Sequence, residues 1–103
     1  MNERIARFTQ ALAKSPGNEL ARFSLGKAHF DAGEFKSARE HFVLAVTGKP
    51  DWMAAQILLG KCALSLGDSA AAIEILTRAL ALAKAQSHEG PQSELEQMLA
   101  ELA

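Results

Sequence analysis

Residues 25–46 read LGKAHFDAGEFKSAREHFVLAV, and residues 59–80 read LGKCALSLGDSAAAIEILTRAL. The two stretches share a Leu-Gly-Lys triplet and further identical residues that are always 34 positions apart, namely Gly33 and Gly67, Ala38 and Ala72, and Ala45 and Ala79. The same offset of 34 extends toward the N-terminus, where it relates Phe8, Ala11 and Pro16 to Phe42, Ala45 and Pro50. The chain therefore contains an internal repeat, and repeats of about 20–50 residues form stacked architectures.

Each repeat unit has the composition of two antiparallel helices. Small residues at fixed places allow two helices to approach closely, and Pro16 and Pro50 end each unit. Alanine and leucine favour helix, while only three prolines interrupt the chain. We therefore expect six helices, near residues 2–14, 19–32, 35–48, 52–66, 69–86 and 93–102. The expected N-cap residues of three of these helices are Asn18, Asp51 and Asp68.

The last expected helix does not continue the repeat. Gly90-Pro91 predicts a break before it, and Ser93 followed by Glu96 predicts a capping box at its start. Its apolar residues form a single stripe: Leu95, Met98, Leu99 and Leu102. We expect this helix to cover the last unit, because the end of a stacked repeat needs a polar outer surface.

These residues resemble the tetratricopeptide repeat, in which a Leu-Gly pair is followed by an aromatic residue, an Ala, a large apolar residue, a second Ala and a Pro. The resemblance spans about residues 4–86, and in the first full unit it rests on Leu25, Gly26, Gly33, Ala38, Phe42, Ala45 and Pro50. In the second unit it rests on Leu59, Gly60, Gly67, Ala72, Leu76 and Ala79. It implies an all-α, right-handed α-solenoid in a single domain (1–103), with a half repeat (1–16), two repeats (19–52 and 53–86) and a capping helix (91–103).

Three slots depart from the family pattern. The tryptophan that the family places three residues before each Leu-Gly pair is Arg22 and Gln56 here, and its later aromatic residue is His29 and Ala63. Lys84 replaces the final proline. Without that proline, the helix near 69–86 is expected to continue past its usual end.

Charge and composition disfavour several classes of function. The net charge of −1 gives no basis for nucleic-acid binding, and no apolar run is long enough to span a membrane. Cys62 is the only cysteine and no secretory signal is present, so we expect a cytoplasmic protein. Residues 1–50 carry +3 and residues 51–103 carry −4, an asymmetry that suits either head-to-tail association of copies or a screened surface without function.

The family resemblance implies that the first helix of each pair lines a concave groove for extended or helical peptides. Beyond the stripe needed for packing, these helices carry a second stripe: Leu20, Phe23, Lys27 and Phe30, then Ala54, Ile57, Lys61 and Leu64. Asp31, at the end of the first of these helices, completes the candidate set. Such a stripe suits a ligand with an apolar surface and an acidic group. The alternative interpretation is that the phenylalanines belong to the core between helices and the lysines are merely solvated.

The candidates for catalysis or metal binding are His29, His41, His88 and Cys62, and they form no recognisable constellation. Cys62 occupies the slot of Ala28, which indicates a small buried side chain, and His41 is expected to face solvent. We therefore expect that the chain is not an enzyme and that it binds no cofactor or metal. The predicted function is a protein-interaction module that binds a short peptide or helix, as an adaptor or scaffold subunit. The alternative is a self-associating structural module, a homo-oligomer without a dedicated ligand.

Overall fold

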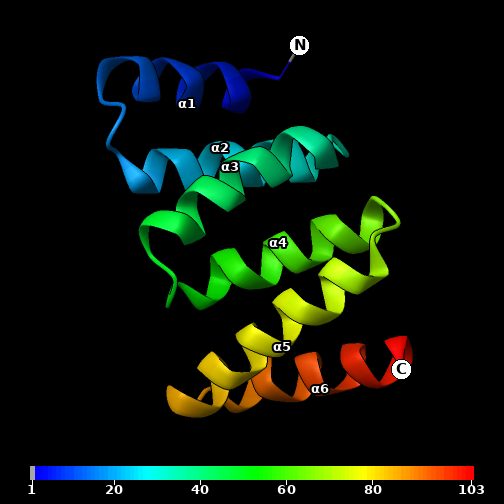
Figure 1. Ribbon diagram of the computed structural model, residues 1–103. Helices are drawn as coiled ribbons and strands as arrows, with labels where there is room; N and C mark the ends of the chain where they lie inside the picture. The colour runs from blue at the N-terminus through cyan, green and yellow to red at the C-terminus, as the bar shows by residue number, and fades with distance from the viewer. Residues whose placement is uncertain (1) are drawn as a thin grey trace.

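The computed structural model describes residues 2–103 and consists of six α-helices. Their bounds are α1 (Glu3–Lys14), α2 (Glu19–Asp31), α3 (Phe35–Gly48), α4 (Met53–Ser65), α5 (Ser69–Ala85) and α6 (Glu89–Leu102). The helices are stacked in chain order, and the chain reverses direction at every turn (Figure 1). Within residues 2–103 no strand is present, so the all-α solenoid expected from the repeat is confirmed.

The helix starts show that the repeat register dominates over capping preference. The side chains of Asn18 and Asp68 accept hydrogen bonds from the backbone N–H groups of Ala21 and Ala71, as predicted for N-caps. The prediction for Asp51 is wrong, because α4 begins at Met53 with Trp52 in the N-cap position and no side-chain cap. Trp52 lies 34 residues after Asn18, so the second unit begins at the same place as the first.

The turns inside the two helix pairs are closed in the same way. Gly33 and Gly67 have φ angles of 78° and 80°, which favour glycine because it lacks a Cβ. The N–H of Glu34 donates to the carbonyl of His29 at 2.9 Å, and the N–H of Asp68 donates to the carbonyl of Ala63 at 2.8 Å. These bonds satisfy carbonyl groups at the helix ends and fix the antiparallel return of each second helix.

The turn between α5 and α6 differs from the other turns between units. Helix α5 continues to Ala85, as the replacement of proline by Lys84 predicts. Ser87 adopts a φ of 59°, and the N–H of His88 donates to the carbonyl of Ala83 at 2.9 Å, which reproduces the glycine turns without a glycine.

Helix α6 begins at Glu89, so the expected start at residue 93 is wrong, and so is the capping box of Ser93 and Glu96. Pro91 lies in the first turn of α6, where its missing N–H would have no partner within the helix. The predicted apolar stripe is confirmed, since Leu95 is fully buried and Met98, Leu99 and Leu102 pack beside it.

The core forms two clusters along the stack. One contains Phe42, Leu59 and Cys62, and the other contains Leu76 and Leu95. Gly26 and Gly60 make these contacts possible, because a Cβ at Gly60 would lie 2.5 Å from Leu76 Cδ2 and one at Gly26 would lie 2.9 Å from Phe42 Cε1. The repeated Leu-Gly pair therefore supplies a buried leucine and a smooth surface for the large residue of the following helix.

Candidate peptide-binding face

The first helices of the two full units, α2 and α4, are in direct contact. Their predicted stripes therefore lie on neighbouring helices and are equivalent in sequence. We use the term first-helix face for the exposed parts of these stripes, which consist of Leu20, Lys27, Asp31, Ala54 and Lys61.

The aromatic members of the predicted stripe are half-buried and join neighbouring helices. Phe23 stacks on Trp52 with ring centroids 4.7 Å apart and also meets Phe42 at 5.7 Å. Phe30 packs edge-on against Phe35 at 5.3 Å. Both phenylalanines contact the core cluster that contains Phe42 and Leu59, so each contributes to the junction between units.

Two aliphatic members of the stripe also face inward. Ile57 and Leu64 are partly buried against the cluster of Leu76 and Leu95. Leu20, in contrast, is 68% exposed at the start of α2, the highest value among the exposed large apolar side chains of residues 2–103. Its equivalent on α4, Ala54, is exposed as well. The apolar surface available to a ligand on this face is therefore centred on Leu20.

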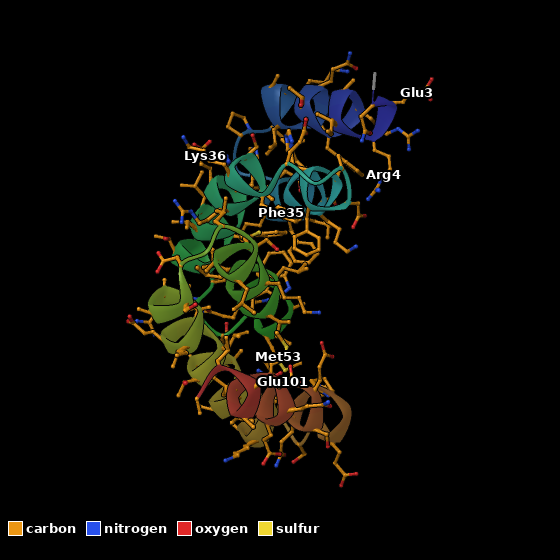
Figure 2. The ribbon with its side chains drawn as sticks, turned by 90° about the vertical axis from the view of Figure 1, so that its right-hand side faces the viewer. Glu3, Arg4, Phe35, Lys36, Met53 and Glu101 are labelled. Atoms are coloured by element: carbon orange, nitrogen blue, oxygen red, sulfur yellow. The ribbon has the colours of Figure 1, made fainter. Side chains whose placement is uncertain are left out.

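Ion pairs hold the charged groups of the face. Asp31 accepts from Lys27 Nζ at 3.0 Å and from Arg4 Nη1 at 3.1 Å, and Figure 2 shows the Arg4 side chain directed from α1 toward α2. The Lys27 hydrogen bond, with Arg4 adding to it, lowers the pKa of the Asp31 carboxyl below its ordinary value. Lys61 Nζ pairs with Glu94 Oε1 of α6 at 3.0 Å. The two equivalent lysines thus each lie beside one carboxylate.

The candidate catalytic side chains are engaged in packing. Cys62 is fully buried, and burial raises the pKa of its thiol to about 11, so the thiol is protonated at neutral pH. His29 Nδ1 lies 2.8 Å from Glu34 Oε1, and its ring stacks on His41 at 5.5 Å. The prediction that His41 faces solvent is wrong, because its Nδ1 is buried and burial lowers its pKa. Residues 2–103 contain no group of three or more His, Cys, Asp or Glu side chains arranged for a metal ion.

Comparison with known proteins identifies the family. Two family models described as tetratricopeptide repeat match residues 5–52 and 54–86. The TPR repeat-containing protein PA0015 of Pseudomonas aeruginosa is 36% identical over 91 residues, which cover 88% of this chain and 87% of that protein. The chain belongs to the tetratricopeptide repeat family.

Solved structures with a similar fold agree with the assignment of the chain to the tetratricopeptide repeat family. Protein BPP2914 from Bordetella parapertussis matches with a TM-score of 0.85 and 30% identity, over 99% of this chain and 89% of that one. PcrH from Pseudomonas aeruginosa matches with a TM-score of 0.86 over 95% of this chain and 75% of that one, and its 21% identity shows a shared fold alone.

Tetratricopeptide repeats are general protein–protein interaction modules, and the match of both family models indicates such a module in this chain. Its partners are therefore proteins. None of the helices between residues 2 and 103 combines the length and the apolarity that crossing a bilayer requires.

One feature of this tetratricopeptide repeat chain was missed from the sequence. Arg22 and Gln56, which replace the tryptophan of the family, both turn back onto the proline that precedes them. Arg22 Nη2 donates to the Pro16 carbonyl at 3.4 Å, and Gln56 Nε2 donates to the Pro50 carbonyl at 3.0 Å. Gln56 also lines a pocket of about 710 Å³ between α3 and α5. The sequence signal for this feature was a polar residue at the position where the family has a tryptophan.

Proposed function

We propose that this chain holds an acidic, partly apolar peptide or a single helix of a partner protein against the first-helix face, as an adaptor or scaffold subunit. The observation that carries the proposal is the identity of Lys27 and Lys61 between the two units. Eight positions are identical between residues 19–52 and 53–86, and five of these pairs are buried on both sides. The glycine turns account for a sixth pair.

Packing therefore explains six of the eight identities and leaves two, Lys27 with Lys61 and Glu40 with Glu74. Only the lysines belong to the first helices. Their side chains remain 43% and 35% exposed, and no buried contact requires an ammonium group at either place. A ligand that crosses both helices and carries acidic groups would use the same cation twice.

The ion pairs of the face are suited to exchange with a ligand. Exposed ion pairs contribute about 0–1 kcal/mol, so the carboxylate of a ligand can replace Asp31 or Glu94 at little cost. The lysine stems would cover apolar atoms of the ligand while their ammonium groups pair with its acids. Leu20, about two helical turns before Lys27 on α2, would supply the apolar contact.

The test begins with capture and identification of the partner on the intact chain, followed by affinity measurements on variants. The double variant Lys27→Gln with Lys61→Gln removes both ammonium groups and avoids placing a second carboxylate next to Asp31. Its control is Lys36→Gln with Lys84→Gln, which changes the net charge equally on the exposed surfaces of α3 and α5. We expect at least about tenfold weaker binding for the first pair and none of this loss for the control. Equal affinities would remove the lysines from the site.

Leu20→Ser tests the apolar part of the same face. It is preferable to changes at Phe23 or Phe30, because both phenylalanines pack between helices and their loss would disturb the fold. Leu44→Ser on α3 is the matched control, since Leu44 is 52% exposed on a second helix. A partner that binds both variants with the same affinity would contradict the proposed contact with Leu20.

The alternative of self-association rests on the charges of the two halves, +3 for residues 1–50 and −4 for residues 51–103. It predicts an oligomer that dissociates as salt screens the charges. Sedimentation at low and high salt distinguishes the two, because a peptide-binding monomer keeps its size in both. The proposal also includes a cytoplasmic setting, which the single unpaired cysteine, Cys62, supports.

A further inference from the structure

A pocket of about 710 Å³ lies between the two second helices α3 and α5, and its residues are distinct from those of the first-helix face. Its size falls within the range of about 300–1,000 Å³ that is usual for small-ligand sites. The walls are mainly apolar, and the lining residues are Val46, Thr47, Pro50, Gln56, Arg78, Ala81, Leu82 and Ala85.

Gln56 gives this pocket a specific polar requirement. Its side chain is buried, with 5% of the residue exposed, and Nε2 donates to the Pro50 carbonyl at 3.0 Å. That bond fixes the orientation of the amide, because the opposite orientation would place two acceptors together. The remaining atom, Oε1, is buried without a hydrogen-bond partner among residues 2–103. A buried acceptor without a partner destabilises the chain, and a ligand that donates to it is correspondingly favoured.

The other polar side chains of the pocket are not buried without a partner. The Thr47 hydroxyl donates to the carbonyl of Val43 at 2.7 Å, which leaves only its lone pairs available. The Arg78 guanidinium pairs with the carboxylate of Glu74, and because its side chain is 60% exposed, water can satisfy its remaining N–H groups. The buried polar atom of the pocket that lacks a partner is therefore the acceptor Gln56 Oε1, and the pocket favours a ligand that donates a hydrogen bond to it.

The preceding unit provides an internal comparison. Arg22 takes the place of Gln56, donates to Pro16 and has no acceptor atom in its side chain. The corresponding pocket, lined by Pro16, Arg22 and Leu44 among others, measures only about 210 Å³. The larger space and the free acceptor are thus found together in the second unit.

We propose that the pocket between α3 and α5 receives the indole ring of a tryptophan from a partner polypeptide, with the indole N–H donating to Gln56 Oε1. Indole is a broad apolar ring whose single polar group only donates, which matches both the walls and the free acceptor. Arg78 at the pocket disfavours a cationic donor such as lysine. Because Oε1 is buried, the ring must insert deeply and the amide must turn slightly about its soft terminal torsion.

The experiment is an NMR titration of the isotope-labelled full chain with N-acetyl-tryptophanamide. We expect saturable shifts of the Gln56 side-chain amide and of the backbone signals of Thr47, Ala81 and Ala85. The analogue methylated on the indole nitrogen keeps the ring and loses the donor, and it should bind at least about tenfold more weakly. Equal binding of the two compounds, or shifts confined to other helices, would overturn the proposal.

Two variants complete the test. Gln56→Arg gives the second unit the side chain of the first, and Ala81→Leu fills the pocket from an exposed position without touching the core. Both should abolish the shifts, and Ala81→Leu should keep the native spectrum elsewhere. Persistent binding by folded Ala81→Leu would overturn the proposal. Lys27→Gln with Lys61→Gln should leave the titration unchanged, so this inference and the proposed function can fail separately.

Discussion

The substitution Gly60→Ala tests the role assigned to the repeated Leu-Gly pair. The added Cβ would lie 2.5 Å from Leu76 Cδ2 and 2.7 Å from Leu76 Cγ, closer than real Cβ contacts allow. Leu76 is fully buried, and its Cγ is attached near the backbone, so the side chain has little freedom to withdraw. Helix α5 must therefore shift away from α4, or Leu76 must leave its preferred rotamer.

The expected magnitude combines two opposing effects. Overpacking of a core costs about 1–3 kcal/mol, while replacing a helical glycine by alanine contributes about 1 kcal/mol of helix propensity. The net loss in the free energy of unfolding is up to about 2 kcal/mol. For a domain of this size, that lowers Tm by up to about 15 °C. Gly48→Ala is the matched control, because Gly48 lies in α3 and the only atom near its Cβ position is the flexible Glu19 Oε1 at 3.2 Å, so this change should be neutral or stabilising.

The assay is urea denaturation followed by circular dichroism, with Gly60→Ala made in the native and the Leu76→Ala backgrounds. Both backgrounds are measured in sucrose, which strengthens burial and keeps the weaker variant folded. Without Cγ and Cδ2 at position 76 the clash disappears, so Gly60→Ala should then raise stability by about 0.5–1 kcal/mol. The same loss in both backgrounds would refute the steric explanation.

Three further predictions concern other parts of the chain. Ser87→Gly should raise the free energy of unfolding by about 0.5–1 kcal/mol in urea denaturation, because Ser87 has a φ of 59°, and an unchanged midpoint would contradict this. Burial lowers the pKa of His41 in the folded chain, so the unfolded chain binds a proton at His41 more readily. The free energy of unfolding should therefore fall as the pH drops below about 6.5, and His41→Gln should make this fall less steep. Cys62 should react with a thiol reagent at pH 8 only after unfolding, since its thiol is fully buried with a pKa of about 11; rapid labelling of the native chain would show otherwise.

The helix pairs could be predicted from the sequence because equivalent residues perform equivalent packing. Leu25 and Leu59 are both buried, and Gly33 and Gly67 both adopt positive φ. The wrong helix starts came from capping preferences, which contribute about 1 kcal/mol and yield to stronger constraints. At α4 the constraint is the repeat register, which places Trp52 on Phe23.

The wrong prediction for the start of α6 had a different cause. Its position depends on Ser87 adopting the left-handed region, a conformation that no local preference of serine predicts. The turn therefore closes directly after α5, and Pro91 falls in the first turn of the next helix instead of marking a break.

The predicted binding stripe mixed residues with different environments, because helical spacing gives the direction of a side chain and not what covers it. Leu20 and Phe23 are neighbours on one stripe, yet Leu20 is 68% exposed while Phe23 lies against Trp52. The covering residue belongs to the next unit, so its effect depends on tertiary packing. The pocket at Gln56 was missed for the same reason, since its walls come from three helices, α3, α4 and α5.

An internal repeat offers a way to separate packing from recognition without any second sequence. Where two units share a buried residue, such as Leu25 and Leu59, the common fold explains the identity. Where they share a half-exposed residue, such as Lys27 and Lys61, burial does not explain the identity, and we propose a ligand that spans both units. Where they differ at an equivalent buried slot, as at Arg22 and Gln56, each unit acquires its own pocket chemistry. On these grounds we propose one extended contact on the first helices and one local contact on the second helices.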